Sequence, residues 1–157
     1  MEIRPIDQAD RTRIDAFLAR RWNSLEMVVL DERVNLGTAD GFFACEKDMI
    51  TGLITFRLSE SGMEILSLDS LREREGTGTA LLAQAVLKAG HHGMKRIRLI
   101  TTNDNLAALR FYQKRGFRLV RIDCSAVDRA RSIKPEIPLI GMNGIPIKDE
   151  IELEMLL

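Results

Sequence analysis

The sequence predicts a mixed α/β (α+β) fold with a mainly antiparallel sheet flanked by helices. In the first half, short β-rich segments follow one another with turn residues between them, which is typical of an antiparallel meander. In the second half, segments with helical periodicity alternate with short β-rich segments, which indicates helices that connect strands. No linker, low-complexity stretch or repeat interrupts this order, so we expect one domain over residues 1–157.

The first half of the chain predicts one helix among several strands. Apolar Ile14, Phe17 and Leu18 recur at helical spacing within residues 10–21. Residues 22–36 are ambiguous, apart from a short strand expected at residues 27–30. The other expected strands cover residues 2–5, 42–46, 52–58 and 63–69, with a turn at residues 46–48.

The second half changes to a helical period. Five apolar residues fall on one helical face, and Gly90 or Gly93 can end that helix: Leu81, Leu82, Ala85, Val86 and Ala89. A second helix is expected over residues 106–115 and is ended by Gly116. Strands are expected at residues 97–101, 117–124 and 151–155.

Composition excludes several classes of protein. Of the 157 residues, 45% are hydrophobic and 29% are charged, which is typical of a globular protein. Lys plus Arg total 23 and Asp plus Glu total 23, whereas a general nucleic-acid binder normally has a basic excess. Cys45 and Cys124 cannot build a disulfide framework and are expected to be reduced, buried thiols.

The sequence gives no sign of a membrane partner. The first residues are charged and lack the apolar stretch of a signal peptide. No run reaches the ~18 apolar residues of a membrane span. We therefore expect a cytoplasmic protein.

Gly76 and Gly78 lie where a strand ends and a helix begins. Glycine lets backbone amides approach a ligand that a Cβ would exclude, and a helix start adds unpaired amides and a partial positive charge. This arrangement is typical of a phosphate or pyrophosphate site, and a plain turn is the alternative interpretation.

Two well-known phosphate loops do not fit this segment. The chain contains no G-x-x-x-x-G-K-[ST] sequence. A dinucleotide fingerprint needs a small residue at position 81, which is Leu81, and an acidic residue after the next strand, where Thr101 and Thr102 occur. The expected ligand is therefore phosphorylated but held in another way.

A second motif follows one helix and one strand later, in the sequence NLAALRFYQKRGF from Asn105 to Phe117. The two motifs together resemble the GNAT superfamily of acyl-CoA N-acyltransferases, whose patterns are [QR]-x-x-G-x-[GA] and N-x-x-A-x-x-x-Y-x-x-x-G-F. The second pattern matches completely. In the first pattern both glycines match, but Glu73 occupies the Gln/Arg position, so charge complementarity would pass to Arg72 or Arg74.

The resemblance implies that acetyl-CoA binds in a splayed cleft between the fourth and fifth strands. Main-chain groups near Ser67 and Leu68 would pair with the pantetheine arm, the glycine loop would hold the diphosphate, and Asn105 would steady the pantetheine. The implied cofactor-binding residues are Ser67, Leu68, Arg74, Glu75, Gly76, Thr77, Gly78, Thr79, Ala80, Asn105 and Ala108.

The resemblance also implies an N-acetyltransferase, in which a primary amine of a small molecule or peptide attacks the thioester directly. Tyr112 would protonate the leaving thiolate, and its alternative role is an interior aromatic. Glu64 is the candidate base, because strand alternation places it on one face with Leu66 and Leu68 near the cofactor. Its alternative role is an ion pair with an arginine. Asn105 could also be only a helix N-cap, and Asp69 is expected to organise the turn before the loop.

The remaining candidates stay open. His91 and His92 occur at a helix end without the cluster that zinc requires, so we expect no metal. The proline-rich segment before the last strand could cover the acceptor pocket. Its acidic residues (Glu136, Asp149 and Glu150) could attract a cationic amine, and the basic cluster of Arg129, Arg131 and Lys134 could attract an anion.

Two other functional classes compete with the enzyme. One is a non-catalytic acyl-CoA-binding sensor, and Tyr112 and Glu64 disfavour it because binding alone requires neither. The other is a protein for a different phosphorylated ligand, which the complete second motif disfavours. The sequence leaves a homodimer open.

Overall fold

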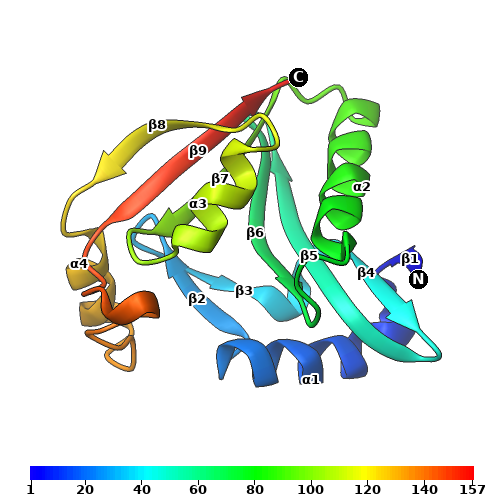
Figure 1. Ribbon diagram of the computed structural model, residues 1–157, viewed down its shortest axis with the longest axis horizontal. Coiled ribbons are helices and arrows are strands. Elements are labelled where there is room, and N and C mark those ends of the chain that lie inside the picture. Colours follow the sequence, from blue (N-terminus) through cyan, green and yellow to red (C-terminus); the bar gives the residue numbers. More distant parts are fainter. The chain divides into compact units, whose positions relative to one another are not determined.

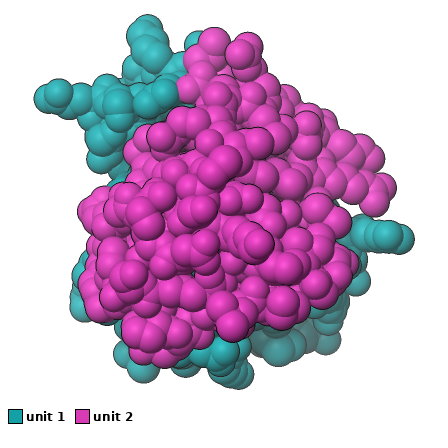
Figure 2. Space-filling model, turned by 90° about the vertical axis from the view of Figure 1, so that its left-hand side faces the viewer, with its two compact units in different colours: residues 1–27, 35–97, 157 teal, residues 28–34, 98–156 magenta.

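The computed structural model describes residues 1–157. The chain divides into two compact units, which Figure 2 shows in different colours: unit 1 comprises residues 1–27, 35–97 and 157, and unit 2 comprises residues 28–34 and 98–156. The fold class is the predicted one, mixed α/β with a mainly antiparallel sheet flanked by helices. The expectation of a single domain stays a prediction.

Unit 1 contains a run of four strands, each antiparallel to the next. Their order is β1 (Glu2–Pro5), β4 (Asp40–Glu46), β5 (Met49–Ser59) and β6 (Gly62–Ser70). The helices of this unit are α1 (Arg11–Trp22) and α2 (Thr77–His91). The turn expected at residues 46–48 is confirmed, since Lys47 and Asp48 connect β4 to β5 with positive φ angles.

Helix α2 packs against β4, β5 and β6 (Figure 1). The helix lies close to β5 at Gly52, where a Cβ would lie 2.7 Å from Thr77 Cγ2 and 3.0 Å from Leu81 Cδ1. Thr77 and Leu81 are both buried. Because Gly52 has no side chain, the first turn of α2 lies directly on the strand.

Helix α1 covers the other face of these strands. Phe42 pairs with Ile54, which is on the face of Gly52, so Phe43 points to the opposite face. The Arg13 guanidinium of α1 lies over the Phe43 ring, 5.4 Å from its centroid. The two helices of unit 1 therefore bury opposite faces of one sheet segment.

Unit 2 contains most of β7 (Arg96–Thr102), followed in the sheet by β9 (Glu150–Leu156) and then β8 (Arg118–Asp123). Strands β8 and β9 are antiparallel. Its helices are α3 (Leu106–Gln113) and α4 (Ala126–Ile133). A separate two-stranded sheet pairs β2 (Glu26–Val29) with β3 (Glu32–Asn35), and its two turn residues, Leu30 and Asp31, both have positive φ. This is the geometry that a two-residue hairpin turn requires.

Three features differ from the expectations. β3 lies in the segment that the sequence left ambiguous. Helix α4 was not expected, because it is only eight residues long and two of its three buried residues are alanines (Ala126, Val127 and Ala130). Cys45 is buried, but the expectation that Cys124 is buried is wrong, because this thiol is exposed. Both cysteines are free.

We expect Gly52→Ala to lower the free energy of unfolding by about 1–3 kcal/mol, because the added methyl group overpacks the contact with Thr77 and Leu81. Gly90→Ala in α2 is the matched control. A Cβ at Gly90 meets nothing within 4 Å, so this change should raise stability by up to about 1 kcal/mol. Urea unfolding of both variants measures the difference. Wild-type stability of Gly52→Ala would show that the helix does not depend on this contact.

Candidate active site

The loop between β6 and α2 is fixed to β5 at both of its ends. At one end, the Leu71 N–H donates to the Thr51 carbonyl at 2.9 Å. At the other end, Thr77 packs on Gly52, the next residue of the same strand. Within the loop, the Ser70 hydroxyl donates to the Arg72 carbonyl at 2.8 Å. Both ends of the loop therefore contact the same two neighbouring residues of β5, Thr51 and Gly52.

Gly76 is the residue before the first turn of α2, and its φ is +81°. A Cβ there meets nothing within 4 Å, so glycine is needed for the backbone conformation and not for space. No side chain of the N-cap residue caps this helix, and the first helical bond runs from the Ala80 N–H to the Gly76 carbonyl at 2.9 Å. The amides that follow Gly76 thus begin the helix without a side-chain acceptor from the cap.

The charges of the loop are partly paired. Arg72 Nη1 lies 3.5 Å from a carboxylate oxygen of Glu46 and 3.5 Å from one of Glu75. Arg72 was one of the two arginines expected to balance the charge of a phosphorylated ligand. The structure gives it two acidic partners within unit 1.

Strand β6 contains a β-bulge at Leu66. Thr55 pairs with Ser67 and Phe56 pairs with Ile65, so Leu66 is the extra residue. The buried hydroxyls of Thr55 and Ser67 lie 2.6 Å apart. Because of this extra residue, the side chains of Ser67 and Ile65 lie on opposite faces of the sheet, although the two residues are two positions apart.

The bulge corrects the expected face of Glu64. Glu64 pairs with Arg57, which is on the same face of β5 as Thr55, whereas Leu68 pairs with Ile54 on the opposite face. The expectation that Glu64, Leu66 and Leu68 share one face is therefore wrong. Simple alternation does not hold across an extra residue.

Glu64 is buried, with 5% of its surface exposed, and forms an ion pair with Arg57. Arg57 Nε donates to Glu64 Oε2 at 3.0 Å. This is the arginine pair that the sequence left open as an alternative to catalysis. The pair explains how a carboxylate can be buried here, since a buried charge needs a partner.

The Asp69 carboxylate contacts two side chains at the C-terminal end of α1. One of its carboxylate oxygens accepts from Trp22 Nε1 at 2.8 Å, and the other lies 3.4 Å from Arg21 Nε. The expectation that Asp69 organises the turn is wrong, because Ser70 makes the hydrogen bond within that turn.

In unit 2, three consecutive polar residues follow β7. Asn103 accepts from the Lys148 and Asp149 amides at 2.9 Å and 3.0 Å, and buried Asp104 accepts from the Met142 amide at 2.9 Å. Asn105 caps α3, since its Oδ1 accepts from the Ala108 N–H at 3.1 Å. The N-cap role of Asn105 is confirmed, and the segment before β9 is tied to this loop.

Tyr112 is buried among aromatic rings. The Phe111 and Phe117 centroids lie 5.1 Å and 5.3 Å from its own, both in edge-to-face arrangements. The interior packing left open as an alternative is therefore present. Packing against two neighbouring rings restricts where the Tyr112 ring can lie, which is compatible with a positioned acid.

The charged groups around α4 have structural partners. Arg129 lies 2.8 Å from an Asp123 oxygen and 3.2 Å from an Asp31 oxygen, and these hydrogen bonds raise the pKa of its guanidinium. Arg131 Nη2 donates to the Pro138 and Ile147 carbonyls at 2.6 Å and 2.8 Å. These contacts hold the segment before β9 in place, so neither arginine is free for an anionic acceptor.

Glu150 is the most buried of the acidic residues considered for the acceptor amine. Its Oε2 accepts from the Leu30 N–H at 3.2 Å, in the turn between β2 and β3. Burial raises the pKa of Glu150 above its ordinary value of 4.5, against the opposing effect of that hydrogen bond. Asp149 instead accepts from the Ser125 amide at 2.8 Å.

Sequence reasoning missed Arg57, the bulge at Leu66 and the bond from Leu30 to Glu150. A signal existed only for Arg57. A hairpin with Glu60 and Ser61 at its turn places residue 57 opposite residue 64.

No three His, Cys, Asp or Glu side chains of the chain converge in a group that could hold a metal ion. None of its helices has the length and apolar character needed to cross a membrane.

A family model for the acetyltransferase (GNAT) family matches residues 6–117, which include both the loop after β6 and helix α3. The chain belongs to the GNAT acetyltransferase family. The Bacillus subtilis (strain 168) relative called uncharacterized protein YxbD is 46% identical over 154 residues, which cover 98% of this chain and 97% of the relative.

Two solved structures show the same fold. A GNAT family acetyltransferase from Elizabethkingia anophelis with acetyl-CoA bound has a TM-score of 0.72 and 22% identity, covering 99% of this chain and 97% of that chain. A Bacillus subtilis acetyltransferase in complex with CoA has a TM-score of 0.71 and 20% identity, covering 99% and 98%.

Glu150→Gln tests the cost of burying the Glu150 carboxylate. A raised pKa in the folded state means that the wild-type protein loses stability as pH rises above about 4.5 and through the raised value. Glutamine keeps an acceptor for the Leu30 amide and does not ionise. The variant should therefore gain stability relative to wild type across this window. Urea unfolding at pH values from about 4 to 8 measures the difference, and a pH-independent difference would contradict the account.

Proposed function

We propose that this protein transfers an acetyl group from acetyl-CoA to a primary amine of a small molecule or peptide, by direct attack of the amine on the thioester. The observation that carries the proposal is the start of α2, which follows Gly76 without a side-chain cap and is fixed on β5 at Gly52. Backbone amides at a fixed helix start suit a diphosphate, because they donate hydrogen bonds and carry partial positive charge.

The proposed cofactor contacts follow the two motifs. Main-chain groups of Ser67 and Leu68 are assigned to the pantetheine arm. Asn105 and Ala108, which the capping hydrogen bond links at the start of α3, are also assigned to the cofactor. The diphosphate group is assigned to Arg74, Glu75, Gly76, Thr77, Gly78, Thr79 and Ala80. Acetyl-CoA brings an activated acyl group, and the protein residues orient it.

The acceptor must lose a proton before it attacks. A lysine-like amine with a pKa of ~10.4 costs about 4.6 kcal/mol to neutralise at pH 7, whereas an α-amine costs only ~1–1.4 kcal/mol. A base is therefore more important for an alkyl amine. A fixed donor for the oxyanion, which we assign to the Leu68 N–H, can contribute roughly 3 kcal/mol more.

We keep Glu64 as the proposed base, directly or through water, with Arg57 as the residue that positions its carboxylate. The 3.0 Å ion pair holds Glu64 in one place on the bulged strand. β-bulges frequently re-aim side chains next to active sites, which supports a functional reason for Leu66 as the extra residue.

Tyr112 is the proposed proton donor to the leaving thiolate. Its ring packs against Phe111 and Phe117, which gives the phenolic oxygen a defined position. A thiolate with a conjugate acid near pKa ~8.5 gains moderately from such a donor.

Gly76→Asp should lower the affinity for acetyl-CoA at least about tenfold, because a carboxylate beside the loop amides repels the diphosphate and competes for its donors. Gly93→Asp is the matched control. Gly93 also has a positive φ and open space around its Cβ position, but it follows the other end of α2. Calorimetry compares the variants. Equal affinity of Gly76→Asp and wild type would reject the loop as the diphosphate site.

Tyr112→Phe should keep acetyl-CoA affinity and lower turnover by roughly tenfold to a hundredfold, since it removes the O–H but keeps the ring packing. Release of free thiol from acetyl-CoA, followed across a library of amines, identifies an acceptor and then measures turnover. Unchanged turnover would remove the proton-donor role. If acetyl-CoA binds tightly but none of the amines causes thiol release, the non-catalytic sensor is favoured over the enzyme.

A further inference from the structure

Unit 1 has a cavity of about 390 Å³ between α1 and the turn that joins β4 to β5. Three arginines of α1 line it: Arg13, Arg20 and Arg21. The only acidic residue in its lining is Asp48. The cavity therefore has an excess of positive charge, in a chain whose formal net charge is zero.

The guanidinium groups of these arginines have few acidic partners within the protein. Nε and Nη2 of Arg13 are buried without a hydrogen-bond partner, and the nearest carboxylate oxygen, from Asp10, is 3.8 Å from Nε. The Arg20 side chain forms no ion pair. Arg21 has only the long 3.4 Å contact with Asp69. The charge of Arg13 therefore has only a distant acidic partner, and the charge of Arg20 has none.

The rest of the lining is apolar. Phe17 and Ile50 are buried, whereas Met49 and Leu71 are largely exposed. An apolar wall next to guanidinium groups suits a ligand with a hydrocarbon body and an anionic end. The volume is within the usual range for a small-molecule site.

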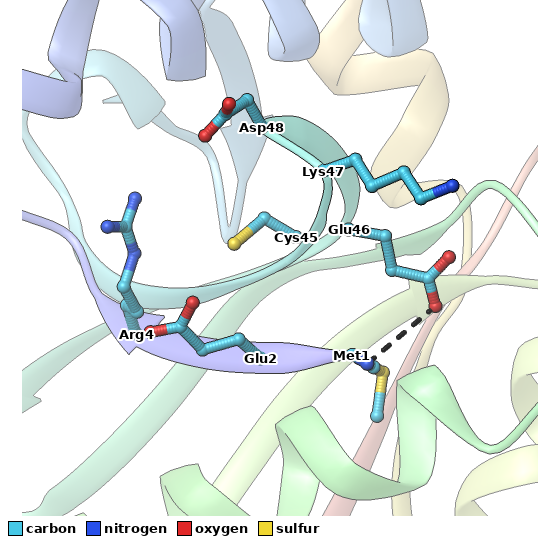
Figure 3. Close-up of a pocket in the computed structure, with 7 residues that line it drawn as sticks. All are labelled: Met1, Glu2, Arg4, Cys45, Glu46, Lys47 and Asp48. Carbon is cyan, nitrogen blue, oxygen red and sulfur yellow. Dashed lines mark ion pairs between the residues drawn. The ribbon is translucent and has the colours of Figure 1, made fainter.

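A second cavity of unit 1 provides the contrast. It has a volume of about 560 Å³ and is lined by residues of β1, β4 and the β4–β5 turn (Figure 3). Its lining mixes acidic Glu2, Glu46 and Asp48 with basic Arg4 and Lys47. It has no such excess of unpaired cations, so the charge argument applies only to the cavity beside α1.

We propose that the cavity beside α1 binds a small organic carboxylate with an apolar body. The carboxylate accepts from the guanidinium groups of Arg13 and Arg20, and the hydrocarbon part covers Met49 and Leu71. Arginine suits this role because its planar donors match the geometry of a carboxylate. This site does not depend on the proposed acetyl transfer, although Leu71 is also the first residue of the loop before α2.

Hexanoate is a suitable probe, and Trp22 is a local reporter. Trp22 is the only tryptophan of the chain, and its Nε1 donates to Asp69, which also contacts Arg21 in the cavity lining. Hexanoate should change Trp22 fluorescence in a saturable way. Neutral hexanamide and the shorter acetate should each bind at least about tenfold more weakly, since one lacks the charge and the other lacks the apolar body.

Two substitutions test whether the change in Trp22 fluorescence comes from hexanoate bound in this cavity. Arg20→Gln should weaken hexanoate binding about tenfold or more, and Arg121→Gln, which removes an exposed arginine of β8, should leave it unchanged. Equal binding of hexanamide, equal binding by Arg20→Gln, or a fluorescence change that does not saturate would each overturn the proposal.

The titration is repeated with saturating coenzyme A. If hexanoate still changes Trp22 fluorescence, its site is separate from the coenzyme A site. If coenzyme A abolishes the change, hexanoate occupies the coenzyme A site, and the proposal of a separate site is overturned. A protein that binds hexanoate but no coenzyme A would refute the proposed function and leave this inference standing.

Discussion

The loop that begins α2 depends on two neighbouring residues of β5. The Thr51 carbonyl holds the first residue of the loop through the Leu71 amide, and Gly52 lets Thr77 lie against the strand where the loop ends. With both ends fixed within one dipeptide, the intervening backbone has little freedom. The positive φ of Gly76 then completes the turn into the helix. A fixed row of amides is what an anion site needs, because no ordering is required when the ligand arrives.

Unit 2 has a comparable arrangement around three consecutive residues. Asn103 and Asp104 hold the segment that precedes β9, and Asn105 begins α3. One loop therefore fixes both the helix that contains Tyr112 and a long segment with little regular structure. Any change that loosens this loop would alter both at once.

The glycine loop, the capping asparagine and most strands could be predicted because each leaves a local signal in the sequence. Gly52 could not, since its importance comes from a contact with Thr77, a residue in another element. The bulge at Leu66 was also beyond prediction, because nothing in the sequence of β6 distinguishes an extra residue from regular alternation. Helix α4 was missed because it is short, and the contacts of Arg131 with the following segment involve residues that lie farther along the chain.

The central claim is that the backbone amides after Gly76 bind the diphosphate of coenzyme A. A backbone-amide NMR titration with coenzyme A tests this claim most directly. The account predicts that the amides of Thr77 and Gly78 are among those with the largest shifts, and that both follow one saturation curve. Shifts confined to regions outside the start of α2 would contradict it.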